Sequence, residues 1–121
     1  MAASYVQNLG VGREFEGSIA AFQPLGKSSW LAASTSTASI ALSVVGPNQI
    51  QVYNNTTGVC YVALGDSTVT ASAGSAGTST SDYPVAPGSV VVMTVPAGID
   101  QVAAVLSAGS GQVLITPGIG L

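Results

Sequence analysis

The sequence of residues 49–64, QIQVYNNTTGVCYVAL, decides the fold class. In residues 49–54 Ile, Val and Asn alternate with Gln and Tyr, and two sets of side chains alternate in the same way in residues 59–64. This period of two is typical of β-strands, whose successive side chains point to opposite faces of a sheet. The block NNTTG between the runs contains residues that accept positive φ and favour turns. We therefore predict a hairpin, with Tyr53 and Tyr61 close together across it.

Similar short runs rich in β-branched residues, bounded by Gly, Pro and Asn, recur from residue 38 onward. Their spacing predicts an all-β fold, an antiparallel β-sandwich that is jelly-roll-like or a small barrel. Alternation gives each sheet one apolar side, and two such sides packed together would form a single core. A helix is an alternative for QVAAVL, but six residues are short for a helix and normal for a strand. The predicted strands are residues 39–45, 49–54, 59–64, 90–95, 101–106 and 112–116.

The connections between these runs also predict turns. Gly-Ser-Gly at residues 109–111 predicts a tight hairpin between the last two strands, and Pro-Gly combinations bracket residues 89–95. Residues 46–48, Gly-Pro-Asn, should turn the chain before the first hairpin. The stretch ASAGSAGTSTS at residues 71–81 is compositionally simple, which predicts a mobile loop or a weak edge strand.

The first 34 residues differ from the rest. They hold four of the seven charged residues, both Phe and the only Trp, and their Gly and Pro interrupt any periodicity. We therefore divide the chain into an extended N-terminal arm, residues 1–34, and a sandwich domain, residues 35–121. Large aromatic side chains must pack on something, which is either the arm's own domain or a neighbouring subunit. The candidate partner-binding residues of the arm are Arg13, Phe15, Phe22 and Trp30, and Tyr83 is a candidate contact in a loop.

The composition argues against most function classes. Only 7 of the 121 residues are charged and none is His, so His-dependent nucleophilic and metal chemistry is excluded. Two basic residues offer no cationic surface, so nucleic acid and anionic membranes are not expected partners. The longest apolar runs are far below the ~20 residues of a membrane-spanning helix. A single Cys and the absence of a recognisable secretory signal favour synthesis in a cytoplasm.

No motif predicts catalysis. Gly65-Asp66-Ser67 resembles the nucleophile block of some Ser hydrolases, but Ser67 lacks a His base, and a strand end followed by an Asx-type turn is the simpler interpretation. Asp66 and Asp82 could together hold calcium, although solvated loop carboxylates are the default. Cys60 on a strand is expected to be a small buried hydrophobe. We predict no catalytic residue, no metal ligand and no cofactor.

Three stretches carry a resemblance. They are QVYNNTTGVCYVALGDST at residues 51–68, YPVAPGSVVVMTV at residues 83–95, and PAGIDQVAAVLSAGSGQVLITPGIGL at residues 96–121. Together they resemble small virion proteins of tailed bacteriophages. The resemblance implies a structural protein without enzymatic activity, such as a decoration or cement protein on the capsid exterior. Its implied partners are the major capsid protein and further copies of itself, with a trimer favoured and a dimer possible.

Two other functions fit the same sequence. A tail, collar or head-fibre component would share these sequence features with a decoration protein. A module that binds a host-surface glycan could use Tyr83, Tyr53 and the Asn-rich loops. Binding of the purified protein to host polysaccharide distinguishes the glycan module, and location in the virion distinguishes the others.

Overall fold

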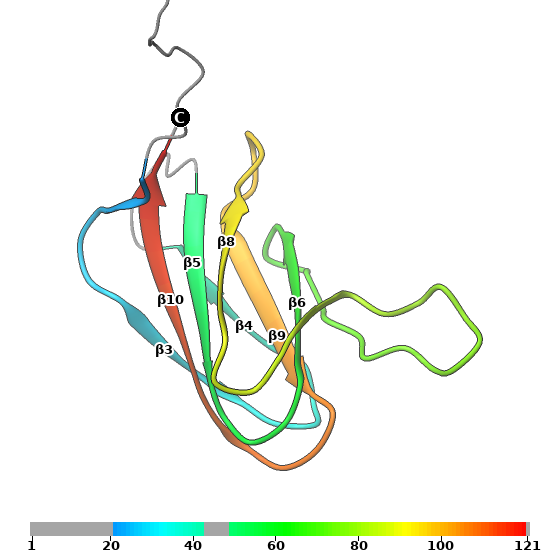
Figure 1. Ribbon diagram of the computed structural model, residues 1–121. Helices are drawn as coiled ribbons and strands as arrows, with labels where there is room; N and C mark the ends of the chain where they lie inside the picture. Colours follow the sequence, from blue (N-terminus) through cyan, green and yellow to red (C-terminus); the bar gives the residue numbers. More distant parts are fainter. Residues whose placement is uncertain (1–20, 43–48, 121) are drawn as a thin grey trace, which may run out of the picture.

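The computed structural model describes residues 21–42 and 49–120, and these residues form two antiparallel sheets packed face to face (Figure 1). No helix occurs in this described part, so the predicted β-sandwich class is confirmed and the helical alternative for residues 101–106 is wrong. The strands are β2 (Gln23–Pro24), β3 (Ser29–Ala33), β4 (Ala38–Ala41), β5 (Gln49–Asn55), β6 (Cys60–Gly65), β7 (Tyr83–Val85), β8 (Val90–Thr94), β9 (Gln101–Leu106) and β10 (Gly111–Ile119).

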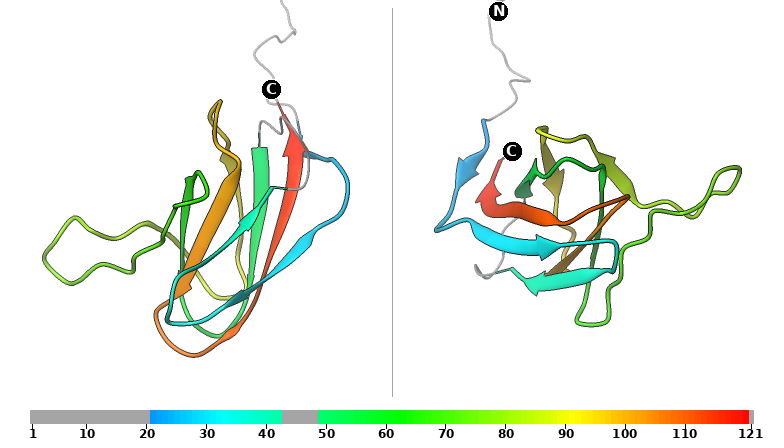
Figure 2. Two further views of the ribbon diagram at one scale, coloured as in Figure 1. Left: turned by 180° about the vertical axis from the view of Figure 1, so that it is seen from behind. Right: turned by 90° about the horizontal axis from the view of Figure 1, so that it is seen from below.

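We name each sheet after one of its inner strands. The β10 sheet has the order β2-β10-β5-β8, and β3 pairs with β10 on the same side as β2. The β9 sheet has the order β4-β9-β6-β7. The end view in Figure 2 shows the two sheets as separate layers. At one side of the sandwich the edge strands β7 and β8 lie at the ends of the two sheets.

The strand pairs are nested along the chain. Strand β6 pairs with β7, β5 with β8, β4 with β9 and β3 with β10. The pairs β6–β7 and β4–β9 belong to the β9 sheet, and the pairs β5–β8 and β3–β10 belong to the β10 sheet. Connections such as β5–β6, β8–β9 and β9–β10 therefore cross from one sheet to the other.

This nesting corrects two predicted hairpins. The residues NNTTG join β5 to β6, but β5 pairs with β8 and β10, while β6 pairs with β7 and β9. The Gly-Ser-Gly turn likewise joins strands of different sheets, β9 and β10. Tyr53 and Tyr61 consequently lie in different sheets and do not face each other. The turn residues bend the chain as expected, but they lead it around the core rather than back along the same sheet.

The core lies between the sheets, where alternate residues of each strand are buried. In β5 the residues Ile50, Val52 and Asn54 are all inaccessible to solvent, which confirms the face that their alternation predicted. Cys60 and Val62 of β6 face them from the opposite sheet and belong to the same cluster. The remaining buried members are Leu31, Ala33, Val85, Val95, Val102, Ala104, Leu106, Val113 and Ile115.

The outer face of the β9 sheet is covered by the chain itself. Ala71 and Val69, in the long β6–β7 connection, pack on Ala103 and Val105 of β9. The backbone N–H of Ala71 also donates to Thr37 Oγ1 at 2.8 Å, which fixes the connection across the sheet. Beyond Ala71 the connection projects from the sandwich as a long loop (Figure 1). Of the two alternatives predicted for residues 71–81, a loop or a weak edge strand, the structure has a loop, since no strand is assigned between β6 and β7.

Part of the predicted arm belongs to the sandwich. Strand β3, which was not predicted, pairs with β10 from Gly111↔Ala33 to Ile115↔Ser29. Leu31 and Ala33 of this strand are buried in the core. The predicted boundary after residue 34 thus lies within the β3–β4 connection, with β2 and β3 on the arm side. Residues 1–20, including Arg13 and Phe15, and the predicted turn at residues 46–48 lie outside the described residues.

Candidate interaction surface

The outer face of the β10 sheet carries a row of apolar side chains across four strands. The register pairs Trp30 of β3 with Leu114 of β10, Leu114 with Tyr53 of β5, and Tyr53 with Val90 of β8. Directly paired residues of antiparallel strands place their side chains on the same face. We call these four residues, Trp30, Leu114, Tyr53 and Val90, the apolar row.

The ends of the apolar row are its most accessible members. Trp30 is 57% exposed and Val90 is 48% exposed, whereas Tyr53 and Leu114 are half-buried. One register step along, Val92 of β8 is 47% exposed beside Gln51 of β5. Three of the five large exposed apolar side chains in the described chain therefore lie on this one face. Clustered exposed apolar surface of this kind marks interaction sites more often than scattered single residues do.

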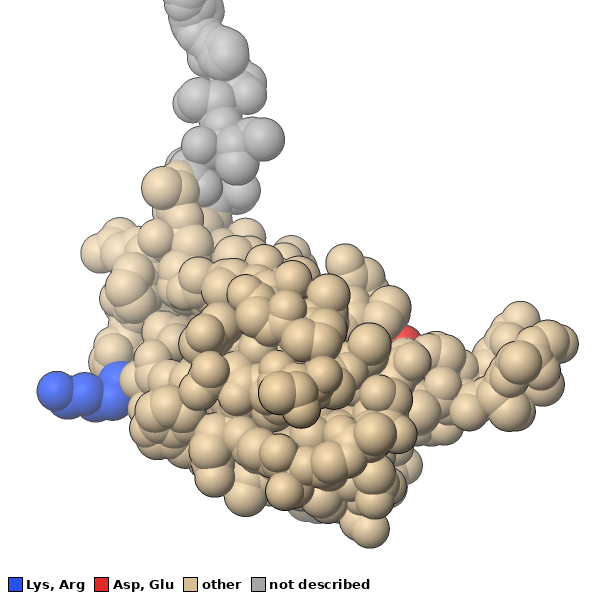
Figure 3. All heavy atoms as spheres, turned by 60° about the horizontal axis from the view of Figure 1, so that its bottom comes forward, with Lys and Arg blue, Asp and Glu red and all other residues tan. Residues whose placement is uncertain are grey.

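No charged residue occurs in the strands that form this face. The four described charges are Lys27 in the β2–β3 loop, Asp66 after β6, Asp82 before β7 and Asp100 before β9. In Figure 3 Lys27 is the only basic side chain in sight, at one edge of the view, and a small acidic patch is visible near the projecting loop on the other side. The outer face of the β10 sheet is instead built from apolar, hydroxyl and amide side chains. Unlike the β9 sheet, it has no segment of the described chain packed over it.

Phe22 extends this face at the end of β10. A Cβ on Gly118 would clash with the Phe22 ring and would lie 2.6 Å from the Gln23 carbonyl oxygen. Gly118 therefore leaves the space in which the half-buried Phe22 ring rests on the sheet. Gly118 and Leu114 are four residues apart on β10 and point to the same side of the sheet. Both described aromatic residues of the predicted arm, Phe22 and Trp30, thus lie on the outer face of the β10 sheet.

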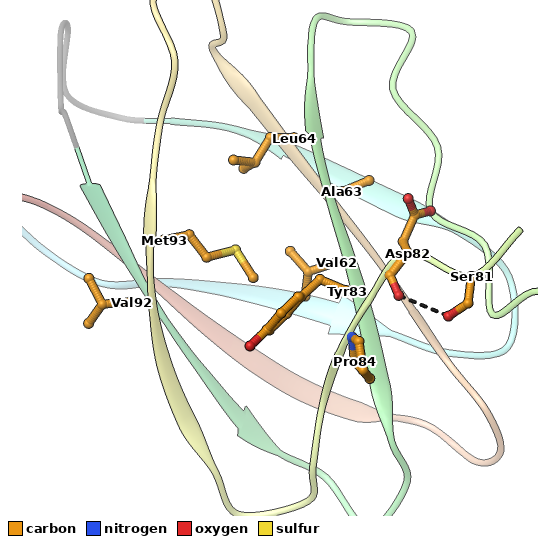
Figure 4. A pocket seen from close by; sticks show the side chains of 9 residues that line it. All are labelled: Val62, Ala63, Leu64, Ser81, Asp82, Tyr83, Pro84, Val92 and Met93. Carbon is orange, nitrogen blue, oxygen red and sulfur yellow. Dashed lines mark hydrogen bonds between the residues drawn. The ribbon is translucent and has the colours of Figure 1, made fainter. Parts of the chain in front are cut away.

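A second feature adjoins this face at the open side of the sandwich. Edge strands β7 and β8 flank a groove of about 760 Å³, which we call the β7–β8 groove. Figure 4 shows the Tyr83 ring in it, pointing from β7 toward β8. Tyr83 pairs with Val62, so its ring lies on the inner side of the sheet, yet it remains 56% exposed. The other lining residues are Ala63, Leu64, Ser81, Asp82, Pro84, Val92 and Met93.

The groove is apolar on the side of the Tyr83 ring. Val62, Leu64 and Met93 lie on this side of β6, whereas Asp82 lies on the other side (Figure 4). The Asp82 carboxylate accepts a hydrogen bond from the backbone N–H of Ser72 at 2.7 Å. The Asp82 carboxylate therefore belongs to the base of the projecting loop and points away from the side of the groove that holds the Tyr83 ring.

Buried Asn54 holds the end of β5 behind the apolar row. Its side-chain amide donates to the carbonyls of Gly58 and Val85, each at 2.9 Å. Its carbonyl oxygen accepts from the backbone N–H of Thr56 at 3.1 Å and from Thr56 Oγ1 at 2.6 Å. These bonds tie the β5–β6 connection to the end of β7. Asn54 thereby fixes the backbone that presents Tyr53 to solvent.

The residues considered for chemistry have structural roles. Asp66 accepts hydrogen bonds from the backbone N–H and the hydroxyl of Thr68, at 2.9 and 2.6 Å, which confirms the Asx-type turn. The Thr68 hydroxyl and N–H hold the pKa of the exposed Asp66 carboxyl below its usual value. Burial raises the pKa of the Cys60 thiol to about 11, so it stays protonated near neutral pH. In the described ranges no three His, Cys, Asp or Glu residues converge as a metal site.

Compared with protein-family models, curated proteins and solved structures, the chain matches none of them. Within residues 21–42 and 49–120, no helix is long and apolar enough to cross a membrane. The function must therefore be argued from the surface of the protein itself.

Sequence reasoning named three residues of this surface, Trp30, Phe22 and, as a possible glycan contact, Tyr53, and it missed others. Trp30 and Phe22 were selected as aromatic members of an arm, and Tyr83 as a loop residue, although Tyr83 begins a strand. Val90 and Val92 were missed because every residue of VVVM is apolar, so alternation could not show which ones face solvent. Leu114 was missed for a related reason, since its exposure depends on which strands flank β10.

Proposed function

We propose that the protein is a non-enzymatic structural component of a bacteriophage virion, which decorates and cements the capsid by binding the major capsid protein. The resemblance of residues 51–68 and 83–121 to small virion proteins suggests this class. The observation that carries the mode of binding is the bare, charge-free outer face of the β10 sheet with its apolar row. The protein would be made in the host cytoplasm and act on the capsid exterior.

The strand order supports this assignment. The chain forms four nested antiparallel strand pairs, and successive pairs belong alternately to the two sheets. This arrangement results when one long hairpin is rolled up around a core. We propose on this basis that the sandwich is a jelly roll, an architecture that recurs in viral capsid proteins and lectins. Architecture alone does not determine function, so the proposal rests on the surface.

A charge-free face suits a broad, permanent contact. Removing hydroxyl and amide groups from water costs less than removing unpaired charges, and interface cores are depleted of charged residues. Trp is enriched among the residues that dominate binding energy. Burying the exposed half of Trp30, at 25 cal/mol per Å² of apolar surface, would contribute about 3 kcal/mol.

Copies of the protein would also contact one another. Decoration proteins occupy sites related by capsid symmetry, so a closed cyclic oligomer is expected, with a trimer favoured and a dimer possible. Residues Arg13 and Phe15 of the arm would add contacts to the capsid or to a neighbouring copy.

The test compares two aromatic residues of nearly equal exposure. Trp30→Ala and Tyr83→Ala are each added to purified heads that lack the protein, and occupancy is measured by sedimentation and cryo-electron microscopy. We expect Trp30→Ala to weaken binding at least ~30-fold, the effect of losing a dominant contact of about 2 kcal/mol. Tyr83→Ala, with its ring on the other side of β8, should bind as the wild type does.

Other results would overturn the proposal. Full occupancy by Trp30→Ala would show that the apolar row is not the contact, and location of the wild type on the tail or collar would exclude capsid decoration. Binding of the purified protein to host polysaccharide, lost in Tyr83→Ala, would instead support the glycan-binding alternative. Circular dichroism of both variants checks that each remains folded.

A further inference from the structure

Strand β8 ends the β10 sheet with an unprotected edge. It pairs with β5 on one side and with no described strand on the other (Figure 1). Edge strands of soluble proteins are usually blocked by Pro, by charged side chains or by short length, since a free edge pairs readily with another strand. Edge strand β7 has three residues and contains Pro84, whereas Val90–Thr94 contains neither Pro nor a charge. At the other side of the sandwich the edge strands β3 and β4 contact each other, so β8 is the edge open to a further strand.

The hydrogen bonds to β5 determine which backbone groups of β8 face outward. The N–H of Asn54 donates to the Ser89 carbonyl at 3.0 Å, and bonding alternates residue by residue along an antiparallel pair. The odd-numbered residues of β8 therefore direct their backbone groups toward β5. The N–H and C=O groups of Val90, Val92 and Thr94 point away from β5, and within the described chain no hydrogen bond reaches them.

The side chains at this edge are apolar on both faces of the sheet. Val90 and Val92 are both about half exposed on the outer face. Figure 4 shows Met93 on the opposite side of β8 from Val92, in the β7–β8 groove that also holds the exposed Tyr83 ring. A strand placed beside β8 would therefore satisfy its outward backbone groups and cover apolar surface on both faces.

The edge of β8 is complementary to itself. In an antiparallel pair centred on Val92, Val92 faces its own copy and Val90 faces Thr94, so every outward-facing residue exchanges hydrogen bonds with the second molecule. A shift of the register in either direction loses bonds, because the Gly88 N–H is already bonded within the sheet and Pro96 has no N–H. No like charges meet in this pair, since the strand has no charged residue.

From this edge geometry we infer that two copies of the protein pair through β8 about a two-fold axis, which joins their β10 sheets into one. An interface that uses the same patch on both molecules is the commonest kind in homo-oligomers. The resemblance to virion proteins favours a trimer, whereas this self-complementary edge selects the dimer. The contact forms in the free protein, so it does not rest on the proposed capsid function.

The oligomeric state of the full-length protein, measured by sedimentation equilibrium, tests the contact. Val92→Lys places two like charges opposite each other, with Cα atoms about 5.5 Å apart, and should raise the Kd of the dimer at least ~30-fold. The matched control Gln51→Lys puts the same charge on the same face one strand further in, about 14 Å from its own copy. Screening at that distance should limit its effect on the Kd to less than ~5-fold. Circular dichroism checks that both variants are folded.

Amide hydrogen exchange, followed by NMR, tests the backbone pairing directly. The N–H groups of Val90 and Thr94 face away from β5, so a second strand must pair with them if they are to exchange slowly. We expect exchange at both positions to be at least ~10-fold slower in the wild type than in Val92→Lys at the same concentration. The N–H of Val91, which faces β5, should exchange at similar rates in the two proteins.

Four results would overturn the inference. A wild type that stays monomeric at NMR concentrations would exclude the pairing, and equal weakening by Val92→Lys and Gln51→Lys would indicate contact through the face of the sheet. A dimer with fast exchange at Val90 and Thr94 would place the interface elsewhere. Slow exchange at these positions in a monomer would show that the chain's own residues pair with β8. Failure to bind capsids, by contrast, would overturn the proposed function and leave the dimer unaffected.

Discussion

Replacement of Asn54 by Ala should destabilise the protein far more than replacement of its neighbour Asn55. The fully buried Asn54 side chain makes four hydrogen bonds, so its removal leaves the buried Val85 carbonyl without this partner and also breaks three part-buried bonds to Gly58 and Thr56. Each bond contributes about 1 kcal/mol. The carbonyl of Gly58 also accepts from Thr56 Oγ1 at 3.0 Å, which reduces the loss at that atom. The expected cost is therefore about 3–4 kcal/mol.

The nature of the loss can be tested with Asn54→Asp, which keeps the size of the side chain. The change replaces both amide donors by an acceptor facing the carbonyls of Gly58 and Val85, and it buries a charge. At pH 7 the cost should at least equal that of Asn54→Ala. Lowering the pH toward 4 should recover part of the stability, because the protonated carboxyl can donate one hydrogen bond again.

Urea and thermal unfolding, followed by circular dichroism and Trp30 fluorescence, measure these costs. For a domain of this size, 3–4 kcal/mol corresponds to a decrease in Tm of about 10–15 °C. The matched control Asn55→Ala removes an exposed side chain whose one hydrogen bond, from the Tyr53 hydroxyl, is 3.3 Å long. It should change the free energy of unfolding by less than ~0.5 kcal/mol. A cost below ~1 kcal/mol for Asn54→Ala, or an equal cost for both variants, would refute the reasoning.

Three further predictions concern single sites. The pKa of the Cys60 thiol is raised from 9.0 to about 11 in the folded protein. The contribution of this protonated thiol to the free energy of unfolding is therefore complete below pH 9 and is lost as the pH rises to 11. Urea midpoints should fall over that range by the equivalent of about 2–3 kcal/mol, and Cys60→Ala should abolish this dependence. Gly118→Ala should cost about 1–3 kcal/mol, because the new Cβ would clash with the Phe22 ring and lie 2.6 Å from the Gln23 carbonyl oxygen, and a Phe22→Ala background should relieve only the part due to the ring, as a double-mutant cycle would show. Thr68→Val should raise the pKa of Asp66 toward its usual value in an NMR titration.

The sequence predicted which segments are strands better than it predicted their partners. Alternation in residues 49–54 correctly placed Ile50, Val52 and Asn54 on the inner face, because burial of one face directly produces a period of two. Pairing leaves no such local pattern. The turn residues at 55–58 suit a hairpin, but the same residues also suit a bend from one sheet to the other. Tyr53 and Tyr61 therefore lie in different sheets, although the sequence placed them together.

The short edge strands were not predictable from local preference. Strand β7 contains Pro84, and β3 has the sequence SWLAA, which has no β-branched residue. Each becomes a strand because a long neighbour, β6 or β10, offers hydrogen-bonding partners along its edge. Prediction of the candidate interaction surface also required knowledge of which strands pair. Trp30 could be recognised as an aromatic residue in need of a contact, but Leu114 and Val90, which share its face of the sheet, come from strands 60 or more residues later.

The nested strand order also has a consequence for how the protein reaches its native state. Trp30 pairs with Leu114, 84 positions later, and even the closest strand pair joins Cys60 to Val85. The described strands form no local hairpin, so each of their pairings requires closure of a long loop and folding should be slow for a chain of this size. Strand β10, the last described strand along the chain, joins β2 and β3 to β5. Until a ribosome has delivered β10, Leu31 and Val52 have no complete core to enter, so the nascent chain should expose apolar residues that favour aggregation until synthesis is complete.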